Sequence, residues 1–341
     1  MKEIYQVTGD AYGGIYVDEK FEKLLENLFG IPEIKKYRMK FPAEWLRLMN
    51  DFEMKKRGRR ALDGKITRIT LPRNFLQMVS EPSASDLATR LSKSCNLHDV
   101  EIYNDEYLCL GPKAMKSLFD PVVNGIIRHM RELLSKHALK NVSCLFMVGG
   151  FAESTILQET VKTAFRSRCR VLVPNYAGIA VVQGATMFGQ KPTIVSSRVM
   201  ATTYGFGITN NFDPKKHDPN KKIVVEGIAM CEDIFDIVVK ENDVVEVGET
   251  KRFTRSPLYS NQTAVRFPFY TSTDPNVKYT TDSSVGPSMG ALVVDSPDTS
   301  KGRNRNIELC IFYGGTEIKV TGVDETSGSA ATVYLDFLTK S

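Results

Sequence analysis

The chain reads VSCLFMVGGFAES from Val142 to Ser154. Its apolar run, Val142–Val148, predicts a fully buried β-strand that ends at Gly149 and Gly150. A buried strand that ends in two glycines before a helix lets the backbone approach a ligand closely at the helix N-terminus. A tight turn alone would explain the same pattern. Apolar residues at helical spacing follow and predict that helix: Ile156, Leu157, Val161 and Phe165.

Helical spacing of apolar residues dominates the rest of the first half. Asp18 is the expected N-cap of the first helix, Gly30 ends it, and a second glycine turn with Gly13 and Gly14 precedes it. Together with a short strand at Val171–Pro174, the helices predict an α/β layer. The predicted helices are Asp18–Phe29, Pro42–Arg57, a long helix from Pro112 through Met130, and Ala177–Phe188.

In the second half the apolar residues follow a period of two, which predicts a β-sandwich. We place the domain boundary at Gly189–Ser197, which gives domains 1–190 and 191–341. Two long polar segments, Thr271–Gly290 and Ser296–Asn306, are expected to be mobile loops. The predicted strands are Ile223–Ile228, Ile234–Val239, Ala264–Tyr270, Ala291–Val294, Ile307–Phe312, Glu317–Val320 and Ala331–Leu335.

Length and composition limit the class of protein. A chain of 341 residues and 38.2 kDa is expected to form two domains, each with its own core. No apolar run approaches the roughly 18 residues that a membrane-spanning helix needs, and the start MKEIYQVTGD lacks the features of a secretory signal. The six cysteines show no metal-ligand spacing, so we expect reduced thiols and a cytoplasmic protein.

The net charge of +5 is unevenly distributed. Between Lys35 and Arg73 there are 13 Lys or Arg residues against four Asp or Glu, a net charge of +9. This basic segment could bind anionic lipid, an acidic partner or a nucleotide, or it could be a solvated helix face. Aromatic residues are not interleaved with it, so we do not expect nucleic-acid binding.

No arrangement of residues predicts a catalytic group or a metal site. The four histidines lie in predicted helices or polar loops and read as surface residues. The carboxylates of Glu232, Asp233 and Asp236 lie near the start of a predicted strand and are expected to be solvent-facing edge charges.

Several motifs together resemble the 70-kDa heat-shock protein superfamily, and more closely its heat shock 70 kDa protein 12 family. Gly13-Gly14 with Asp18 resembles a glycine turn of that family's ATPase domain, Phe52–Arg57 resembles its adenosine-binding helix, and Val148–Phe151 resembles its adenosine loop. In the second half, Ser260–Val265 (SNQTAV) resembles a strand of the family's peptide-binding β-domain, and Thr316–Val320 with Thr326–Gly328 resembles its closing hairpin. The resemblance implies part of an actin-like ATPase domain followed by a β-sandwich of the peptide-binding kind.

The resemblance also implies a cofactor site for ATP or ADP. Its residues here are Gly14, Glu53, Lys56, Arg57, Gly149 and Gly150. The family's phosphate-binding and metal-binding loops, DxGxT and DxGGGT, do not occur in the chain, and Phe151 and Glu153 stand where the family has a serine and an arginine. Nucleotide binding is therefore expected to be weak, or to belong to a longer parent protein. We expect no metal site and no ATP hydrolysis by this chain alone.

For the β-domain the resemblance implies that extended apolar peptide segments bind in a groove. The candidate groove residues are Ile208, Leu258, Val265 and Phe267. The alternative is that these side chains fill the core of the sandwich. The chain ends soon after a strand, without the family's helical lid, so peptide exchange is expected to be fast.

The expected function is thus that of a truncated, chaperone-related member of the family. One alternative is a regulator that senses adenine nucleotides weakly. Another is a scaffold protein whose basic segment binds acidic partners or lipid.

Overall fold

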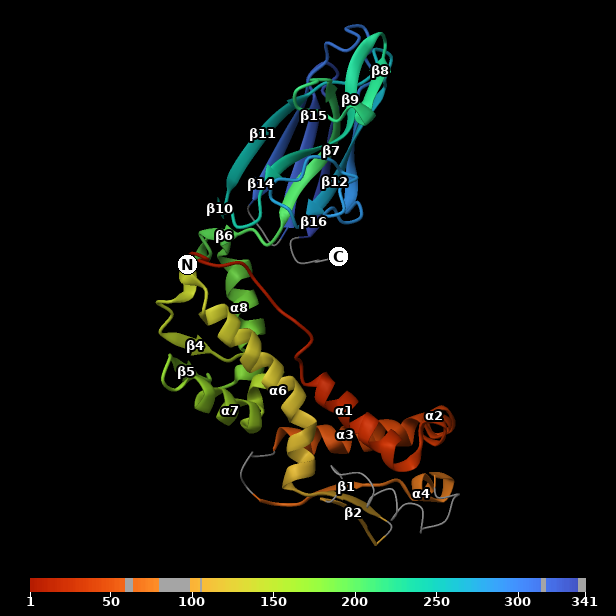
Figure 1. Cartoon of the computed structure of the whole chain (residues 1–341), viewed down its shortest axis with the longest axis vertical. Helices are drawn as coiled ribbons and strands as arrows, with labels where there is room; N and C mark the ends of the chain where they lie inside the picture. The colour runs from red at the N-terminus through yellow and green to blue at the C-terminus, as the bar shows by residue number, and fades with distance from the viewer. Residues whose placement is uncertain (59–63, 80–98, 105, 314–316, 337–341) are drawn as a thin grey trace. The chain divides into compact units, whose positions relative to one another are not determined.

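The chain forms two compact units in the computed structural model (Figure 1). Residues Gly9–Thr186 make up one, here called the helical unit. Met187–Ser341 together with Met1–Thr8 make up the other, here called the β unit. Backbone hydrogen bonds tie the first residues into the β unit, since the Met1 amino group donates to the Ile194 carbonyl at 2.5 Å. The structure describes residues 1–58, 64–79, 99–104, 106–313 and 317–336.

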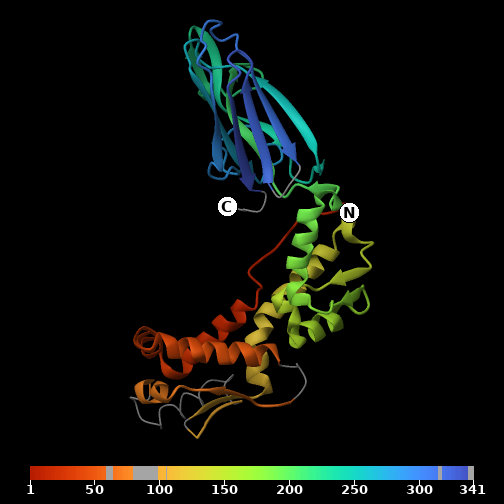
Figure 2. The ribbon, with the colours of Figure 1, turned by 180° about the vertical axis from the view of Figure 1, so that it is seen from behind.

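The long helix α6 (Pro112–Leu134) organises the helical unit. It contacts α1 (Ile15–Phe29) on one side and α7 (Thr155–Phe165) on the other, an order that both views show (Figures 1 and 2). None of the helices in the described ranges is both long and apolar enough to cross a membrane. The other elements are α2 (Ile31–Lys40), α3 (Pro42–Arg57), β1 (Thr67–Thr70), α4 (Arg73–Val79), β2 (Val100–Tyr103), β3 (Tyr107–Leu110), η1 (His137–Leu139), β4 (Cys144–Phe146), η2 (Gly150–Glu153), β5 (Arg170–Leu172) and α8 (Ala177–Gln190).

One apolar core joins these elements. Phe21 of α1 and Phe52 of α3 are both fully buried, and their rings stack with centroids 4.0 Å apart. The helix α1 ends at Gly30, whose φ of 100° is a conformation that favours glycine. The predicted helix over Pro42–Arg57 is confirmed.

Two local predictions for this unit are wrong. The first helix begins at Ile15, so Asp18 lies in its first turn and is not the N-cap. The side chain of Asp18 is instead held by Lys56. The predicted buried strand over Val142–Val148 has only three residues in β4, and the side chain of Phe146 is 67% exposed. Within the described residues β4 pairs with β5 alone, in parallel, and the exposure of Phe146 shows that one face of this short ladder is not covered.

The β unit consists of two antiparallel sheets and a short two-stranded ladder. One sheet has the strand order β13-β12-β7-β9-β8, and the other has the order β11-β14-β15-β16. Thr316 of the predicted closing hairpin lies outside the described residues. The elements are η3 (Pro192–Ile194), β6 (Ser197–Val199), β7 (Thr203–Asn211), η4 (Pro219–Lys221), β8 (Lys222–Val225), β9 (Ile228–Val239), β10 (Val244–Glu246), β11 (Glu249–Arg255), β12 (Ala264–Ser272), β13 (Gly290–Asp295), β14 (Ile307–Tyr313), β15 (Glu317–Asp324) and β16 (Ala330–Asp336).

The two sheets share one apolar core, to which alternate residues of each strand contribute. Phe206 of β7 and Phe267 of β12 meet there edge to face, with ring centroids 6.2 Å apart. Leu309 and Val320 reach the same core from the opposite sheet, and both are fully buried. The chain thus combines helices with several antiparallel sheets.

The two long polar segments of this unit are held by hydrogen bonds. The segment after β12 bridges back to β9, where the Thr280 amide donates to the Asp233 carbonyl at 2.8 Å. The segment before β14 folds around Arg305, whose side chain is fully buried. The Arg305 guanidinium donates to the carbonyls of Gly302, Ser296 and Ser260 at 2.7, 2.8 and 3.2 Å and to the Ser296 hydroxyl at 2.7 Å.

Replacing this buried guanidinium tests how much it stabilises the β unit. Arg305→Met keeps an apolar stem but leaves three carbonyl oxygens without their donor, so we expect the free energy of unfolding to fall by about 3 kcal/mol or more. Urea unfolding followed by circular dichroism measures the change. Lys301→Met, on the exposed part of the same segment, is the control. Equal losses in the two variants would contradict this role for Arg305.

Candidate functional site

The helical unit contains a cavity of about 330 Å³ near the N-terminus of α1. Most residues predicted to bind the cofactor line this cavity, although they come from three distant parts of the sequence. Gly149 is the exception, and it directly precedes Gly150 in the chain. The lining residues are Gly14, Ile15, Asp18, Glu53, Lys56, Arg57, Gly150, Phe151 and Ser154.

Lys56 is the central charge of the cavity and is only 4% exposed. Its Nζ atom donates to Asp18 Oδ1 at 2.6 Å and to the Gly14 carbonyl at 3.1 Å, and it forms an ion pair with Glu53. Lys56 and Glu53 lie on α3, whereas Asp18 lies on α1. The lysine therefore joins the two helices to the glycine turn.

The pKa values of the two carboxylates around Lys56 are shifted in opposite directions: that of Asp18 is raised and that of Glu53 is lowered. Burial raises the pKa of Asp18, and the hydrogen bond from Lys56 offsets this only in part. Burial also acts to raise the pKa of Glu53, but hydrogen bonds from Lys56 and Arg57 outweigh it and leave that pKa below its ordinary value. Arg57 Nε donates to Glu53 Oε1 at 2.7 Å, while the Arg57 side chain remains 60% exposed.

The opposite side of the cavity is the turn before α7. Gly149 has a φ of 92°, and its amide donates to the Ala177 carbonyl at 2.8 Å. The ring of Phe151 packs so close to Gly14 that a Cβ there would lie 3.3 Å from it. Glu153, where the family has an arginine, accepts a hydrogen bond from the Gly178 amide at 3.1 Å.

The charges of this cavity are already balanced. Lys56 and Arg57 face Asp18 and Glu53, so the cavity offers a phosphate group no net positive charge, although Arg57 uses only Nε in its ion pair. The polar groups and the Arg57 guanidinium suit a neutral, hydrogen-bonding ligand such as a nucleoside. No group of three or more His, Cys, Asp or Glu that could hold a metal ion occurs in the described part of the chain.

A larger cavity of about 660 Å³ lies in the β unit, where strands β7 and β12 separate. Their ladder runs from Ser272 opposite Thr203 to Phe269 opposite Phe206 and then stops. The next pair in the same register would be Pro268 and Gly207. Proline has no amide hydrogen to donate, which ends the ladder at this point. Beyond it, β12 stays paired with β13 and β7 stays paired with β9.

All four predicted groove residues line this opening between β7 and β12, here called the fork: Ile208, Leu258, Val265 and Phe267. The structure also supports the alternative for two of them. Val265 and Phe267 are only 7% and 3% exposed and belong to the core shared by the two sheets. They form the floor of the fork, and polar residues make up much of its sides.

The carboxylates of this region are predicted from the sequence to be solvent-facing edge charges, and for Asp236 this prediction is wrong. Asp236 forms an ion pair with Arg255, and both side chains are 25% exposed. Asp233 binds Lys221 Nζ through Oδ2 at 2.6 Å. Both carboxylates line the fork; the paired Asp236 is not a solvent-facing edge charge, whereas the Asp233 side chain is paired but remains 39% exposed. Their partners lie on other elements, β11 and η4, so no local pattern in the sequence indicates these pairs.

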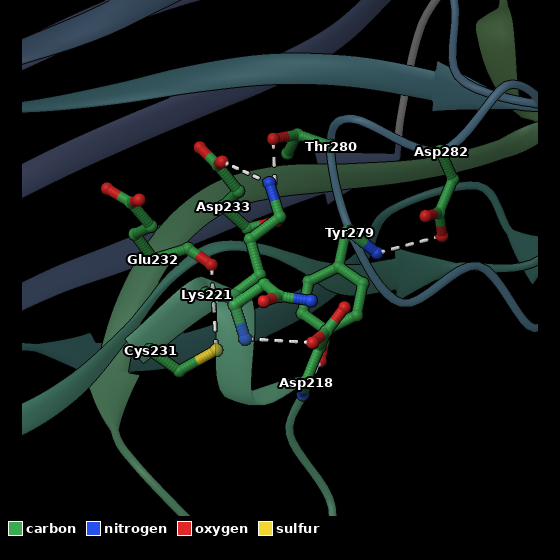
Figure 3. A network of polar contacts seen from close by, with 9 residues as sticks. Asp218, Lys221, Cys231, Glu232, Asp233, Tyr279, Thr280 and Asp282 are labelled. Atoms are coloured by element: carbon green, nitrogen blue, oxygen red, sulfur yellow. Dashed lines mark hydrogen bonds and ion pairs between the residues drawn. The ribbon is translucent and has the colours of Figure 1, made fainter. Parts of the chain in front are cut away.

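Asp233 belongs to a wider polar network (Figure 3). The Tyr279 hydroxyl accepts a hydrogen bond from the Asp218 amide at 2.7 Å, and the Lys221 ammonium lies 6.0 Å from the Tyr279 ring centroid. The Asp282 carboxylate binds the Tyr279 amide at 3.0 Å. The network fixes the segment that carries Thr280 beside the fork, so this side of the fork is pre-organised.

The basic segment keeps much of its positive charge where the structure describes it, although at least four of its eleven described Lys or Arg residues form ion pairs. Arg38 pairs with Glu22 at 2.8 Å and Lys55 pairs with Asp51 at 2.7 Å, in addition to the pairs of Lys56 and Arg57. Residues 59–63, which include two of the arginines, lie outside the described residues. Binding of anionic lipid or an acidic partner by this segment stays a prediction.

Comparisons with known proteins agree with the resemblance seen in the motifs. Mixed helices and antiparallel sheets are consistent with an actin-like ATPase-type α/β fold followed by a β-rich unit. The chain is 36% identical over 341 residues to heat shock 70 kDa protein 12A of Mus musculus, 35% over 341 residues to the same protein of Homo sapiens, and 34% over 347 positions to heat shock 70 kDa protein 12B of Homo sapiens. Each match covers 99% of this chain.

The predicted family is therefore confirmed: this is a heat-shock-70-like chain, related to the heat shock 70 kDa protein 12 family. The chain spans about half the length of the curated relatives it matches, 50% in each case. No family model matches the sequence.

Adjacent lysines on α3 allow a matched test of the buried charge. Lys56→Met leaves the partly buried carboxylate of Asp18 without its cation and leaves Glu53 with Arg57 alone, so we expect a loss of about 3 kcal/mol in the free energy of unfolding at pH 7. Lys55→Met removes a more exposed pair and should cost less than about 1 kcal/mol. Urea unfolding followed by the fluorescence of Trp45, the single tryptophan, measures both.

The pH dependence of this difference follows from the carboxylates. The pKa of Glu53 is lowered in the folded protein, so its stabilising effect is present at neutral pH and is lost as the pH falls through that value. In Lys56→Met, protonation also removes the unpaired charge of Asp18. The penalty should therefore shrink toward about pH 3. A penalty that grows on acidification would contradict this assignment.

Proposed function

We propose that this chain is a chaperone-related protein that binds extended polypeptide segments in the fork between β7 and β12. The separation of the two strands after Phe206 and Phe269 is the observation that carries the proposal. Residues 207–211 of β7 and residues 264–268 of β12 therefore form no backbone ladder with one another. An extended peptide can use such backbone groups by strand addition, a common mode of peptide recognition.

The dimensions of the fork support this proposal. A volume of about 660 Å³ is within the range of ligand pockets. The core beneath, which includes Phe267, and the hydrogen-bonded segments on both sides keep the opening in shape. The kinship with heat-shock-70-like proteins agrees with a peptide-binding role.

The helical unit favours a second function, weak binding of an adenine nucleoside or nucleotide. The convergence of Gly14, Glu53, Lys56, Arg57 and Gly150 on one cavity supports it. Because the cations there are paired, the proposed binding energy comes from the nucleoside and little from the phosphates. We accordingly propose no ATP hydrolysis by this chain alone.

The cytoplasm is the proposed location. Five cysteines in the described residues are free thiols (Cys109, Cys144, Cys169, Cys231, Cys310). Reduced, mostly buried thiols fit a reducing compartment.

Peptide binding is tested by fluorescence anisotropy with labelled extended decapeptides. We expect saturable binding, and Asn210→Trp, which fills the fork from an exposed position, should weaken it about tenfold or more. Asn220→Trp makes the same change on η4, outside the cavity, and should leave binding intact. Absence of saturable binding, or equal affinities in the two variants, would overturn the proposal.

Nucleotide binding is tested by isothermal titration. We expect adenosine, ADP and ATP to bind with dissociation constants on the order of 1 mM and within about threefold of one another. Arg57→Ala should weaken all of them, because it removes the exposed guanidinium at the cavity. ATP binding that is much tighter than adenosine binding and depends on Mg²⁺ would contradict the balanced-charge cavity.

A further inference from the structure

Five charged residues line the fork: Asp233, Asp236, Arg255, Arg266 and Arg303. The first three form ion pairs. Asp233 is bound by Lys221, and Asp236 is bound by Arg255. The other two, Arg266 and Arg303, have no carboxylate of the described residues within ion-pair distance. The fork therefore presents two arginines that form no ion pair with a described carboxylate, although the charge of Glu226 lies near that of Arg303.

Arg266 lies on β12 between Val265 and Phe267, and it is exposed whereas both neighbours are buried. Successive residues of a strand point to opposite faces, so Arg266 projects away from the core. It belongs to the part of β12 that has left β7, where an inserted peptide backbone would run. A side chain of that peptide would thus come within reach of the guanidinium.

Arg303 approaches the fork from the segment before β14. Its Nη2 lies 3.9 Å from Met230 Sδ, a weak contact that leaves the remaining donors of the guanidinium free. The nearby carboxylate of Glu226 is held by Ser260, which donates to it through its amide at 2.9 Å and through its hydroxyl at 2.6 Å. These hydrogen bonds fix the position of the Glu226 carboxylate but leave its negative charge, which offsets part of the charge of Arg303.

Polar atoms contribute more of the accessible surface of the fork than apolar atoms do. Val265 and Phe267 are almost wholly buried in the core. Much of the remaining lining is polar, including Thr209, Asn210 and Gln262. An apolar peptide side chain could contact Ile208 or Leu258, but it would also desolvate polar groups without replacing their hydrogen bonds.

We propose that the fork selects extended peptides that carry acidic side chains, whose carboxylates pair with Arg266 and Arg303. Arginine holds a carboxylate with two parallel hydrogen bonds, so the two arginines supply both charge and direction. The inference rests on the proposed peptide-binding function and gives the class of peptide.

The test compares labelled decapeptides that differ only at two central positions, which are Glu, Gln, Lys or Leu. We expect the Glu peptide to bind about fivefold more tightly than the Gln peptide, the upper range for one exposed ion pair. The Lys and Leu peptides should bind more weakly than the Gln peptide. The advantage of Glu should disappear at about 1 M salt, where the screening length is short.

Arg266→Gln and Arg303→Gln should each reduce the affinity for the Glu peptide while leaving the affinity for the Gln peptide unchanged. Lys319→Gln, on an exposed position of β15, removes the same charge away from the fork and should change neither. Equal binding of the Glu and Leu peptides, or equal effects of the three variants, would overturn the inference and leave the peptide-binding proposal standing. No saturable binding of any peptide would overturn both.

Discussion

The interruption of the β7–β12 ladder at Pro268 is the constraint on which the β unit depends. Each strand keeps its outer partner, β13 or β9, so the sheet does not come apart. The cost is limited to the few hydrogen bonds that the two strands no longer exchange, each worth about 1 kcal/mol net. Val265 and Phe267 still reach the common core and offset that cost. A sheet can thus hold an opening about 660 Å³ in volume without losing its packing.

In the helical unit the buried Lys56 is the residue on which the arrangement of the cavity depends. Lys56 stabilises the meeting of α1, α3 and the glycine turn because it satisfies a carbonyl and two carboxylates at once. A buried charge of this kind is held by its partners and contributes no free electrostatic attraction. The feature that organises the cavity therefore also limits what the cavity can bind. A neutral nucleoside fits this balance, whereas a phosphate chain needs cations that are not already paired.

The sequence predicted those features that depend on local spacing. Helical periodicity placed α3. The residues predicted to bind a nucleotide followed from the resemblance to the heat-shock family and not from spacing, and all of them except Gly149 line one cavity. The role of Asp18 could not be predicted, because a carboxylate in a first turn and an N-cap look alike until the partner helix is placed. The ion pair of Asp236 with Arg255 depends on which strands lie together. The fork itself depends on register, and a proline within a strand does not reveal which neighbour it faces.

The buried Arg305 connects the stability of the β unit with the charge of the fork. It binds the carbonyls of Ser296 and Gly302, which both precede Arg303 in the same segment, and so fixes the path of that segment beside the fork. It also binds the carbonyl of Ser260, the residue whose amide and hydroxyl hold Glu226. One fully buried guanidinium thus holds both the segment that carries Arg303 and the residue that binds Glu226. The separation of this arginine from this carboxylate, and with it the positive charge that the fork retains, therefore depends on how the loops pack.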